Sequence, residues 1–336
     1  MRPSRRLRQN ACLLAAAAAT FGAAFLSLPD RVAAQQPPLQ IAGPTPDPST
    51  SNYPIPGMSR TRATTNNPAL LGGAPPKARV TSATAASTPV EPLVSLTPQS
   101  DIPVCNAAVL EAIRAMPTGG GYSASHAATE RLRASISLQD TGGRAFSITP
   151  TLAKPSYCSS ATYLVFLKAV EILRRRGDLR LDDRALGALL VNGQRDGEGV
   201  WGRWNANGPG TARLFHELGL GENFIEGNRA RPGDFMKIFW TPAIGKKEHG
   251  HSVVFLGRER AGDGTEWVHF WSSNQGVGYG DKRVPATRIK YAIYSRLEDP
   301  RRLETAADSL PPVDPFLASL LTQETSTDAV RNQCGL

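Results

Sequence analysis

The chain has 336 residues, a net charge of +9 and 7% aromatic residues. Its lysines and arginines form no dense block with interleaved aromatic side chains, so the composition argues against a nucleic-acid-binding protein. Only one apolar stretch, near the N-terminus, approaches the roughly 20 residues that a membrane-spanning helix needs, so the sequence does not predict a protein with several membrane spans.

The first 34 residues have the pattern of a secretory signal peptide. Four arginines among the first eight residues precede an apolar run at 11–28, and Val32-Ala33-Ala34 offers small residues for cleavage. We therefore expect a periplasmic or secreted protein that has no membrane partner after cleavage; a retained N-terminal anchor is the alternative. Removing five arginines and one aspartate from the 38 basic and 29 acidic residues leaves a net charge of +5.

Residues 35–100 are rich in proline, threonine, serine and alanine and contain few aromatic residues. Such a segment cannot bury enough apolar surface to offset the entropy cost of ordering it. We expect a disordered linker in front of the folded domain.

The composition becomes typical of a globular domain at residues 101–301, which is long enough for one hydrophobic core. Apolar periodicity and helix-stop signals predict four helices, at 104–116, 125–138, 159–176 and 181–191. Short runs of aromatic and β-branched residues predict four strands, at 234–240, 252–256, 266–271 and 288–294. Helices followed by strands indicate an α+β fold with a small antiparallel sheet. Residues 302–336 are expected to form a C-terminal tail with a short helix at 314–322.

Cys12 leaves with the predicted signal peptide, so three cysteines remain in a compartment that permits disulfides. Cys105 and Cys334 stand near the two ends of the folded region, and the termini of a domain often lie close together. We expect a disulfide between them, which leaves Cys158 as a free thiol. A disulfide between Cys105 and Cys158 is the alternative, and it would abolish a catalytic role for Cys158.

Cys158 directly precedes the apolar stripe of the helix expected at 159–176. A helix N-terminus stabilises a thiolate through its unpaired N–H groups and its dipole, and the backbone N–H of Cys158 can help to bind an oxyanion. His251 opens an apolar strand further along the chain, where an imidazole can take a proton from a neighbouring thiol. For Cys158 alone, a buried and inert thiol is the alternative.

Three motifs follow one another along the chain: Tyr157-Cys158-Ser159-Ser160, Pro232-Gly233-Asp234, and GHSVVFLG at 250–257. In this order they resemble the papain-like cell-wall cysteine peptidases and amidases of the NlpC-like and CHAP families. The resemblance spans residues 150–290. It implies a helix that carries the cysteine, an antiparallel sheet that carries the histidine, and hydrolysis of peptidoglycan amide bonds. Ser160 departs from the pattern, since many NlpC-like members have glycine there, and the long interval between Cys158 and His251 implies an insertion.

A third polar residue should orient the imidazole and select its tautomer. Members of the families that this chain resembles carry it on the strand after the histidine, where Asn274 is our first choice and His269 the second. Strand residues alternate between two faces, so Asn274 and His269 cannot both point inward unless a bulge intervenes. A turn residue before Gly276 is the alternative role for Asn274.

The implied insertion contains the segment WGRWNANGPG at 201–210. Exposed indole rings offer flat surfaces to sugars or peptides, and amide or guanidinium groups add directional hydrogen bonds. We therefore expect Trp201, Arg203, Trp204 and Asn205 to bind substrate, with Tyr122 as a further candidate. The alternative is that the two tryptophans fill the edge of the hydrophobic core.

His249 and His251 form an H-x-H pair, which raises the alternative of a zinc site with His216, His269 or Asp234 as the third ligand. The pair lies at a turn and no other metal-binding motif accompanies it. We therefore expect neither a metal nor another cofactor.

Together these features predict a secreted or periplasmic cysteine amidohydrolase that acts on peptidoglycan or its peptide stems. Cys158 attacks an amide carbonyl, His251 acts as general base and then acid, and Asn274 orients His251. Two alternatives stay open. The same fold can serve as a non-catalytic cell-wall-binding module, or the cysteine hydrolase can act on a protein or a small amide.

Overall fold

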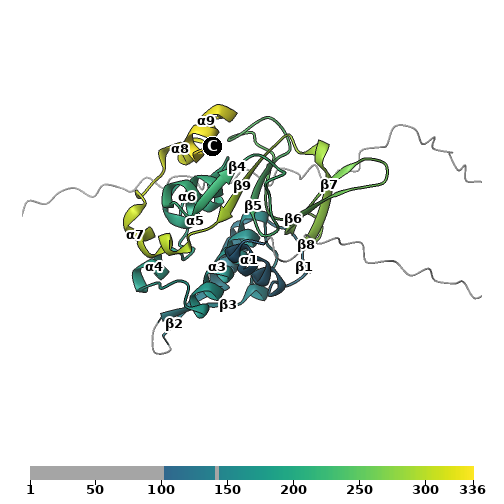
Figure 1. Cartoon of the computed structure of the whole chain (residues 1–336). Helices are drawn as coiled ribbons and strands as arrows, with labels where there is room; N and C mark the ends of the chain where they lie inside the picture. The colour runs from purple at the N-terminus through teal and green to yellow at the C-terminus, as the bar shows by residue number, and fades with distance from the viewer. Residues whose placement is uncertain (1–101, 141–143) are drawn as a thin grey trace, which may run out of the picture. The chain divides into compact units, whose positions relative to one another are not determined.

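The computed structural model of the chain describes residues 102–140 and 144–336. The predicted signal peptide at 1–34 and the predicted linker at 35–100 lie outside the described residues. The described part combines helices with an antiparallel sheet (Figure 1), in agreement with the mixed helix-and-sheet class expected from the sequence. No helix in this part is long and apolar enough to cross a membrane.

Within the described residues, seven strands form the main sheet in the order β1-β8-β7-β6-β5-β9-β4, and each neighbouring pair is antiparallel. The strands are β1 (Gly119–Gly120), β4 (Gly221–Phe224), β5 (Phe235–Phe239), β6 (Gly250–Arg260), β7 (Glu266–Asn274), β8 (Gly278–Pro285) and β9 (Tyr291–Leu297). A register shift between Phe255 and Gly257 marks a bulge where β6 pairs with β7. A separate ribbon joins β2 (Ile136–Asp140) to β3 (Arg144–Ile148).

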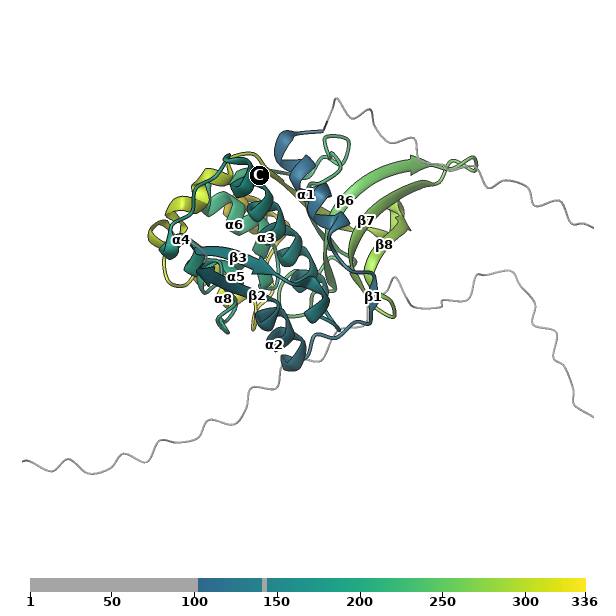
Figure 2. The same ribbon diagram turned by 90° about the horizontal axis from the view of Figure 1, so that it is seen from below.

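The central helix α3 (Cys158–Arg176) contacts other helices and strands β6 and β7 of the sheet (Figure 2). The others are α1 (Val104–Arg114), α2 (His126–Ala134), α4 (Asp183–Ala188), α5 (Gly199–Asn205), α6 (Gly210–Leu218), α7 (Ala306–Ser309), α8 (Pro315–Ser319) and α9 (Thr327–Cys334). Short 3-10 helices occur at Pro150–Leu152, Ala286–Arg288 and Pro300–Thr305.

Helix α3 forms where the sequence predicts it because its apolar stripe faces the core. Leu164, Leu167 and Val170 are fully buried, and Gly177 ends the helix in the left-handed conformation, at a φ of 84°. Phe166 of α3 stacks on Trp204, with 4.8 Å between the ring centroids. This packing fixes the direction of α3 and therefore the position of its first residue, Cys158.

Several predicted elements change at their ends. The second helix stops at Ala134 because the residues after it leave the helix and pair with β3, with Ile136 opposite Ile148. The strand predicted at 288–294 begins at Tyr291, and β8 was missed because glycines and charged residues interrupt its apolar pattern.

Residues 302–336 are part of the folded body and do not form the predicted tail. Leu317 of α8 and Val330 of α9 are fully buried, and Gly245 forms an isolated bridge with Glu324. Asn223 of β4 also donates a hydrogen bond to the carbonyl of Cys334. The C-terminal helices thus cover α6 and the adjacent edge of the sheet.

Candidate active site

Cys158 is the first residue of α3 and is partly exposed. Tyr157 precedes it as the N-cap in an extended conformation and makes no side-chain capping bond. The N–H groups of the first turn of a helix have no partners inside the helix, so they point past Cys158 with the positive end of the helix dipole. Neither Ser159 nor Ser160 caps the helix, because both lie inside it.

The thiol of Cys158 forms hydrogen bonds with the imidazole of His251 and with the backbone N–H of Ser252. His251 lies at the start of β6, opposite Ile238 of β5, and is 3% exposed. Two rings enclose the imidazole: Trp240 at 6.4 Å and Phe270 at 5.7 Å between ring centroids. This apolar surrounding excludes water and strengthens the electrostatic interactions of the imidazole.

Asn274 contacts the other side of the imidazole. Its Oδ1 lies 3.2 Å from Nε2 of His251, while its Nδ2 donates to the carbonyls of Ser272 and Gly280 at 3.3 and 2.8 Å. Because the amide nitrogen faces two carbonyls, Oδ1 must accept a hydrogen bond from Nε2–H. That tautomer leaves Nδ1 of His251 as the nitrogen that takes the thiol proton.

The register of the sheet explains why Asn274 occupies this position. Val254 of β6 pairs with Trp271 of β7. Continued by three residues, the same antiparallel register leads to His251 and Asn274, whose side chains are in contact. The bulge in β6 lies beyond this region, between Phe255 and Gly257. His269 therefore stands on the far side of the bulge, opposite Gly257, where its Nε2 lies 3.1 Å from Glu259. The structure does not bring His269, the second choice for the third residue, to His251.

Burial raises the pKa of the Cys158 thiol, but the hydrogen bond and the charge of His251, the backbone N–H of Ser252 and the charge of Lys237 outweigh it. Together they lower the pKa of Cys158 from its ordinary value of 9.0 to about 7. A large fraction of a thiol with this pKa is thiolate at neutral pH, which is the nucleophilic form. Cys158 therefore has the electrostatic surrounding of a reactive cysteine.

Three of the predicted substrate-binding residues are buried instead. Trp201 and Trp204 are each 1% exposed and Arg203 is fully buried. Trp204 donates to the hydroxyl of Thr162 at 3.2 Å, and Arg203 pairs with Glu217 at 2.7 Å. The prediction of a binding surface here was wrong because the insertion forms helix α5, which packs the two tryptophans against α3 and directs Arg203 toward Glu217 of α6.

Asn205 and Tyr122 lie next to the thiol-bearing segment. The Oδ1 atom of Asn205 accepts a hydrogen bond from Oγ of Ser159 at 2.5 Å. Tyr122 forms a parallel bridge with Ser156, two residues before Cys158. Both residues are partly exposed, and substrate binding by these two of the five candidates stays a prediction.

The cysteines are free in the described residues, so neither the expected Cys105–Cys334 disulfide nor the alternative with Cys158 is present. Cys105 lies in α1, with its Sγ 3.9 Å from the carbonyl of Glu298, whereas Cys334 ends α9. The two belong to different clusters of the hydrophobic core, which the order of the chain did not show.

Asp234 of the Pro-Gly-Asp motif holds elements together. Its carboxylate accepts hydrogen bonds from the Asn106 side chain at 2.8 Å, from the Arg231 N–H at 2.7 Å and from two nitrogens of Arg296 at 2.9 Å each. Gly233 has a φ of 95°, and a Cβ there would meet the backbone oxygen of Asn106 at 2.8 Å. The motif thus anchors α1 to the start of β5 and does not reach Cys158.

The alternative zinc ligands are not brought together. His269 contacts Glu259, and Asp234 contacts Arg296. Across the part of the chain that the structure describes, no group of three or more His, Cys, Asp or Glu residues is arranged to hold a metal ion.

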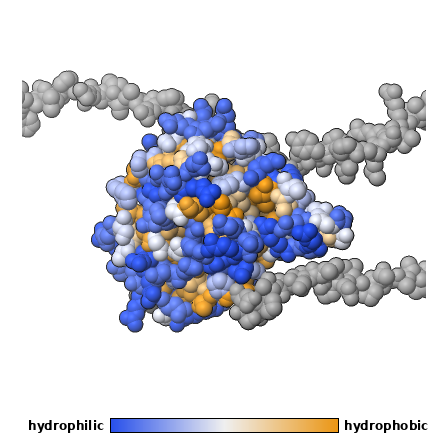
Figure 3. Space-filling view, turned by 45° about the horizontal axis from the view of Figure 1, so that its top comes forward, coloured by the Kyte–Doolittle hydropathy of each residue, from blue (hydrophilic) through white to orange (hydrophobic). Residues whose placement is uncertain are grey.

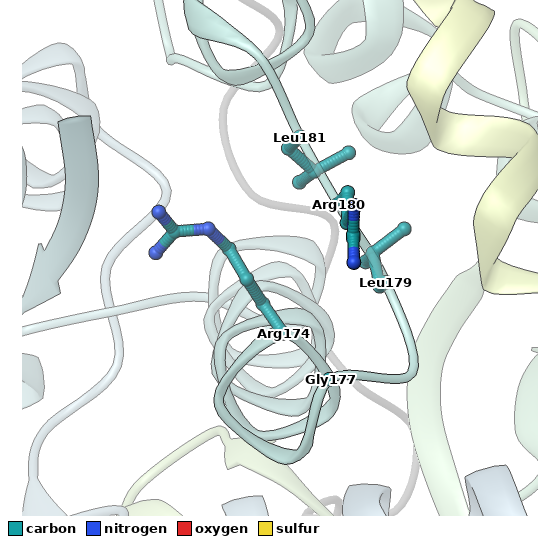
Figure 4. A pocket seen from close by; sticks show the side chains of 5 residues that line it. All are labelled: Arg174, Gly177, Leu179, Arg180 and Leu181. Atoms are coloured by element: carbon teal, nitrogen blue, oxygen red, sulfur yellow. The ribbon is translucent and has the colours of Figure 1, made fainter. Parts of the chain in front are cut away.

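A cavity of about 430 Å³ opens at the opposite end of α3, lined by Arg174, Gly177, Leu179, Arg180 and Leu181 (Figure 4). The 19 residues of α3 place this cavity about 27 Å from Cys158, at 1.5 Å per residue. Since it contains neither nucleophile nor base, it is not the candidate active site.

On the face shown in Figure 3, hydrophobic residues form small patches between hydrophilic ones.

The sequence did not single out three charged residues that are linked to one another: Lys237, whose charge acts on the thiol, Glu248, which binds Lys237, and Asp196, whose pKa both of them influence. Lys237 donates to Glu248 at 2.8 Å, and its charge helps to lower the pKa of Cys158. A signal for Lys237 was present in Phe235-Met236-Lys237-Ile238-Phe239, since a single lysine in an apolar strand must have a partner if its side chain is buried. Asp196 gave no such signal.

Comparisons of the chain with models of known families, with curated proteins and with solved structures gave no match.

Proposed function

We propose that this protein is a cysteine amidohydrolase with a papain-like arrangement of helix and sheet, and that it hydrolyses amide bonds of peptidoglycan in the periplasm or outside the cell. One observation carries the catalytic part: the hydrogen-bonded series Cys158, His251 and Asn274, with the thiol at a helix N-terminus. The order of the sequence motifs and the predicted signal peptide support the substrate and the location.

In the proposed reaction, the Cys158 thiolate attacks the carbonyl carbon of the amide. The N–H of Cys158 and the dipole of α3 stabilise the oxyanion that forms. The C–N bond then breaks while the imidazolium of His251 protonates the leaving amine, and an acyl thioester remains. His251 next takes a proton from water, the resulting hydroxide attacks the thioester, and the carboxylate product leaves as Cys158 is regenerated.

The burial of Trp201 and Trp204 removes the observation that favoured a non-catalytic wall-binding module. Hydrolysis of a protein or a small amide would use the same chemistry. Assays with different substrates therefore distinguish peptidoglycan from these two alternatives.

The test is the release of soluble fragments from purified peptidoglycan sacculi by the protein without residues 1–34. We expect release by the wild type and at least a thousandfold loss in Cys158→Ala, since removing a catalytic nucleophile costs about three to six orders of magnitude. Cys105→Ala is the matched control, because that buried thiol lies in α1, outside the proposed machinery. Equal release by wild type and Cys158→Ala would refute the mechanism.

A further inference from the structure

One wall beside Cys158 is formed by the segment between α4 and α6. The hydrogen bond between Asn205 and Ser159, at 2.5 Å, attaches this segment to the residue after Cys158. Two successive backbone N–H groups then bind two carboxylates: Asn207 donates to Asp196 at 3.0 Å, and Gly208 donates to Glu248 at 2.5 Å. The segment therefore places two acidic side chains close to the candidate active site.

The two carboxylates have different partners. Glu248 is buried and its two oxygens are occupied by Lys237 at 2.8 Å, Gly245 N–H at 3.0 Å and Gly208 N–H. Its negative charge is compensated inside the protein. Glu248 is thus a structural anchor for the wall and for Lys237.

Asp196 has only the Asn207 N–H on its Oδ2 and is partly exposed. Within residues 102–140 and 144–336 it forms no ion pair. Its pKa is raised to about 6, mainly by burial and also by the charge of Glu248. The Asn207 N–H and the charge of Lys237 oppose this rise. A partly exposed carboxylate that binds one backbone N–H and forms no ion pair can still bind a cationic ligand.

Asp196 is held by the same segment that contacts the start of α3: Asn207 binds its carboxylate, and Asn205 binds Ser159. The pKa of the Tyr157 phenol is raised to about 12, mainly by burial, and the negative charges of Cys158 and Asp196 raise it further. Its hydrogen bond to Thr129 opposes the rise. Tyr157 is therefore within electrostatic range of both groups. Two hydrogen bonds, with only Ala206 between Asn205 and Asn207, thus link the Asp196 carboxylate to Ser159, the residue after Cys158.

We propose that Asp196 determines specificity by binding a cationic group of the substrate, such as a primary ammonium, beside the amide that Cys158 attacks. This inference rests on the proposed function for the identity of the reaction and adds the charge of the substrate. Asp196 acts by binding and takes no part in the proton transfers of His251.

The first test needs no enzymatic activity. Methanethiosulfonate reagents transfer a thiol-linked group to Cys158 while methanesulfinate leaves, and they exist with an ammonium, a neutral methyl or a sulfonate group. We expect the ratio of the ammonium rate to the neutral rate at Cys158 to fall about five- to tenfold in Asp196→Asn, from the loss of one nearby partly screened charge. Asp263→Asn, which removes an exposed carboxylate from the turn between β6 and β7, should change the ratio less than twofold. An unchanged ratio in Asp196→Asn would overturn the proposal.

The second test uses sacculi with free amines and sacculi whose amines have been acetylated. We expect Asp196→Asn to lose at least tenfold in rate on the untreated sacculi and to match the wild type on the acetylated ones. Equal losses on both, with Cys158-dependent digestion intact, would overturn the role of Asp196 and leave the proposed function standing. If the wild type digests neither, the proposed function fails, and the reagent rates alone decide on Asp196.

Discussion

Replacing His251 with alanine should return Cys158 to the behaviour of an ordinary thiol. His251 supplies both the hydrogen bond and the largest charge that lower the pKa of Cys158, against a burial contribution that raises it. Without the imidazole, burial remains and is opposed only by the Ser252 N–H and Lys237. We therefore expect a pKa of about 9 or higher in His251→Ala, as for an ordinary thiol.

The pKa values set the size of the effect. With a pKa of about 7, roughly half of Cys158 is thiolate at pH 7, whereas a pKa of 9 leaves about 1%. Since the thiolate is the reactive form, the rate of iodoacetamide labelling at pH 7 should fall about fiftyfold in His251→Ala. In the wild type the rate rises with pH through about 7, and in the variant this rise moves to about pH 9 or above.

The assay measures the labelling rate of the Cys158 peptide by mass spectrometry between pH 5 and 10. His269→Ala is the matched control, because His269 contacts Glu259 and does not reach His251; it should keep the wild-type midpoint. A midpoint near 7 in His251→Ala would refute the reasoning, since it would show that another group ionises the thiol. A shifted midpoint in His269→Ala would make that residue part of the site.

Two further predictions concern the third residue and the insertion. Asn274→Ala removes the acceptor of the His251 Nε2–H. Because the required tautomer is then lost, kcat/KM should fall about 10- to 1,000-fold, while the circular dichroism spectrum is retained. A loss below threefold would contradict an orienting role. Trp204→Ala deletes a fully enclosed indole and should lower the free energy of unfolding by about 3–5 kcal/mol in urea titrations. A loss below 1 kcal/mol together with weaker wall binding would show that Trp204 binds substrate.

Local patterns predicted much of the framework. The stripe of apolar residues in α3 and the aromatic and β-branched runs of β5, β6 and β7 have periods that follow directly from helix and strand geometry. Strands β1, β4 and β8 were missed. Their glycines and charges carry no clear period, and pairing with neighbouring strands stabilises them.

The residues of the insertion show the limit of this reasoning. The local sequence around Trp201 and Trp204 is the same whether these side chains line a cleft or fill a core. Only the packing of α5 on α3 decides that they are buried. Cys105 and Cys334 likewise stand near the ends of the folded region, but their separation in space depends on where α1 and α9 pack. Residue type and order do not contain this information.

The chain alone was enough to identify Cys158 at a helix start and His251 at a strand start, because both positions are properties of short segments. The choice between Asn274 and His269, the surroundings of Asp196 and the burial of the tryptophans required the tertiary structure. These features depend on strand register and on the contacts of distant segments, which arise only when the chain folds.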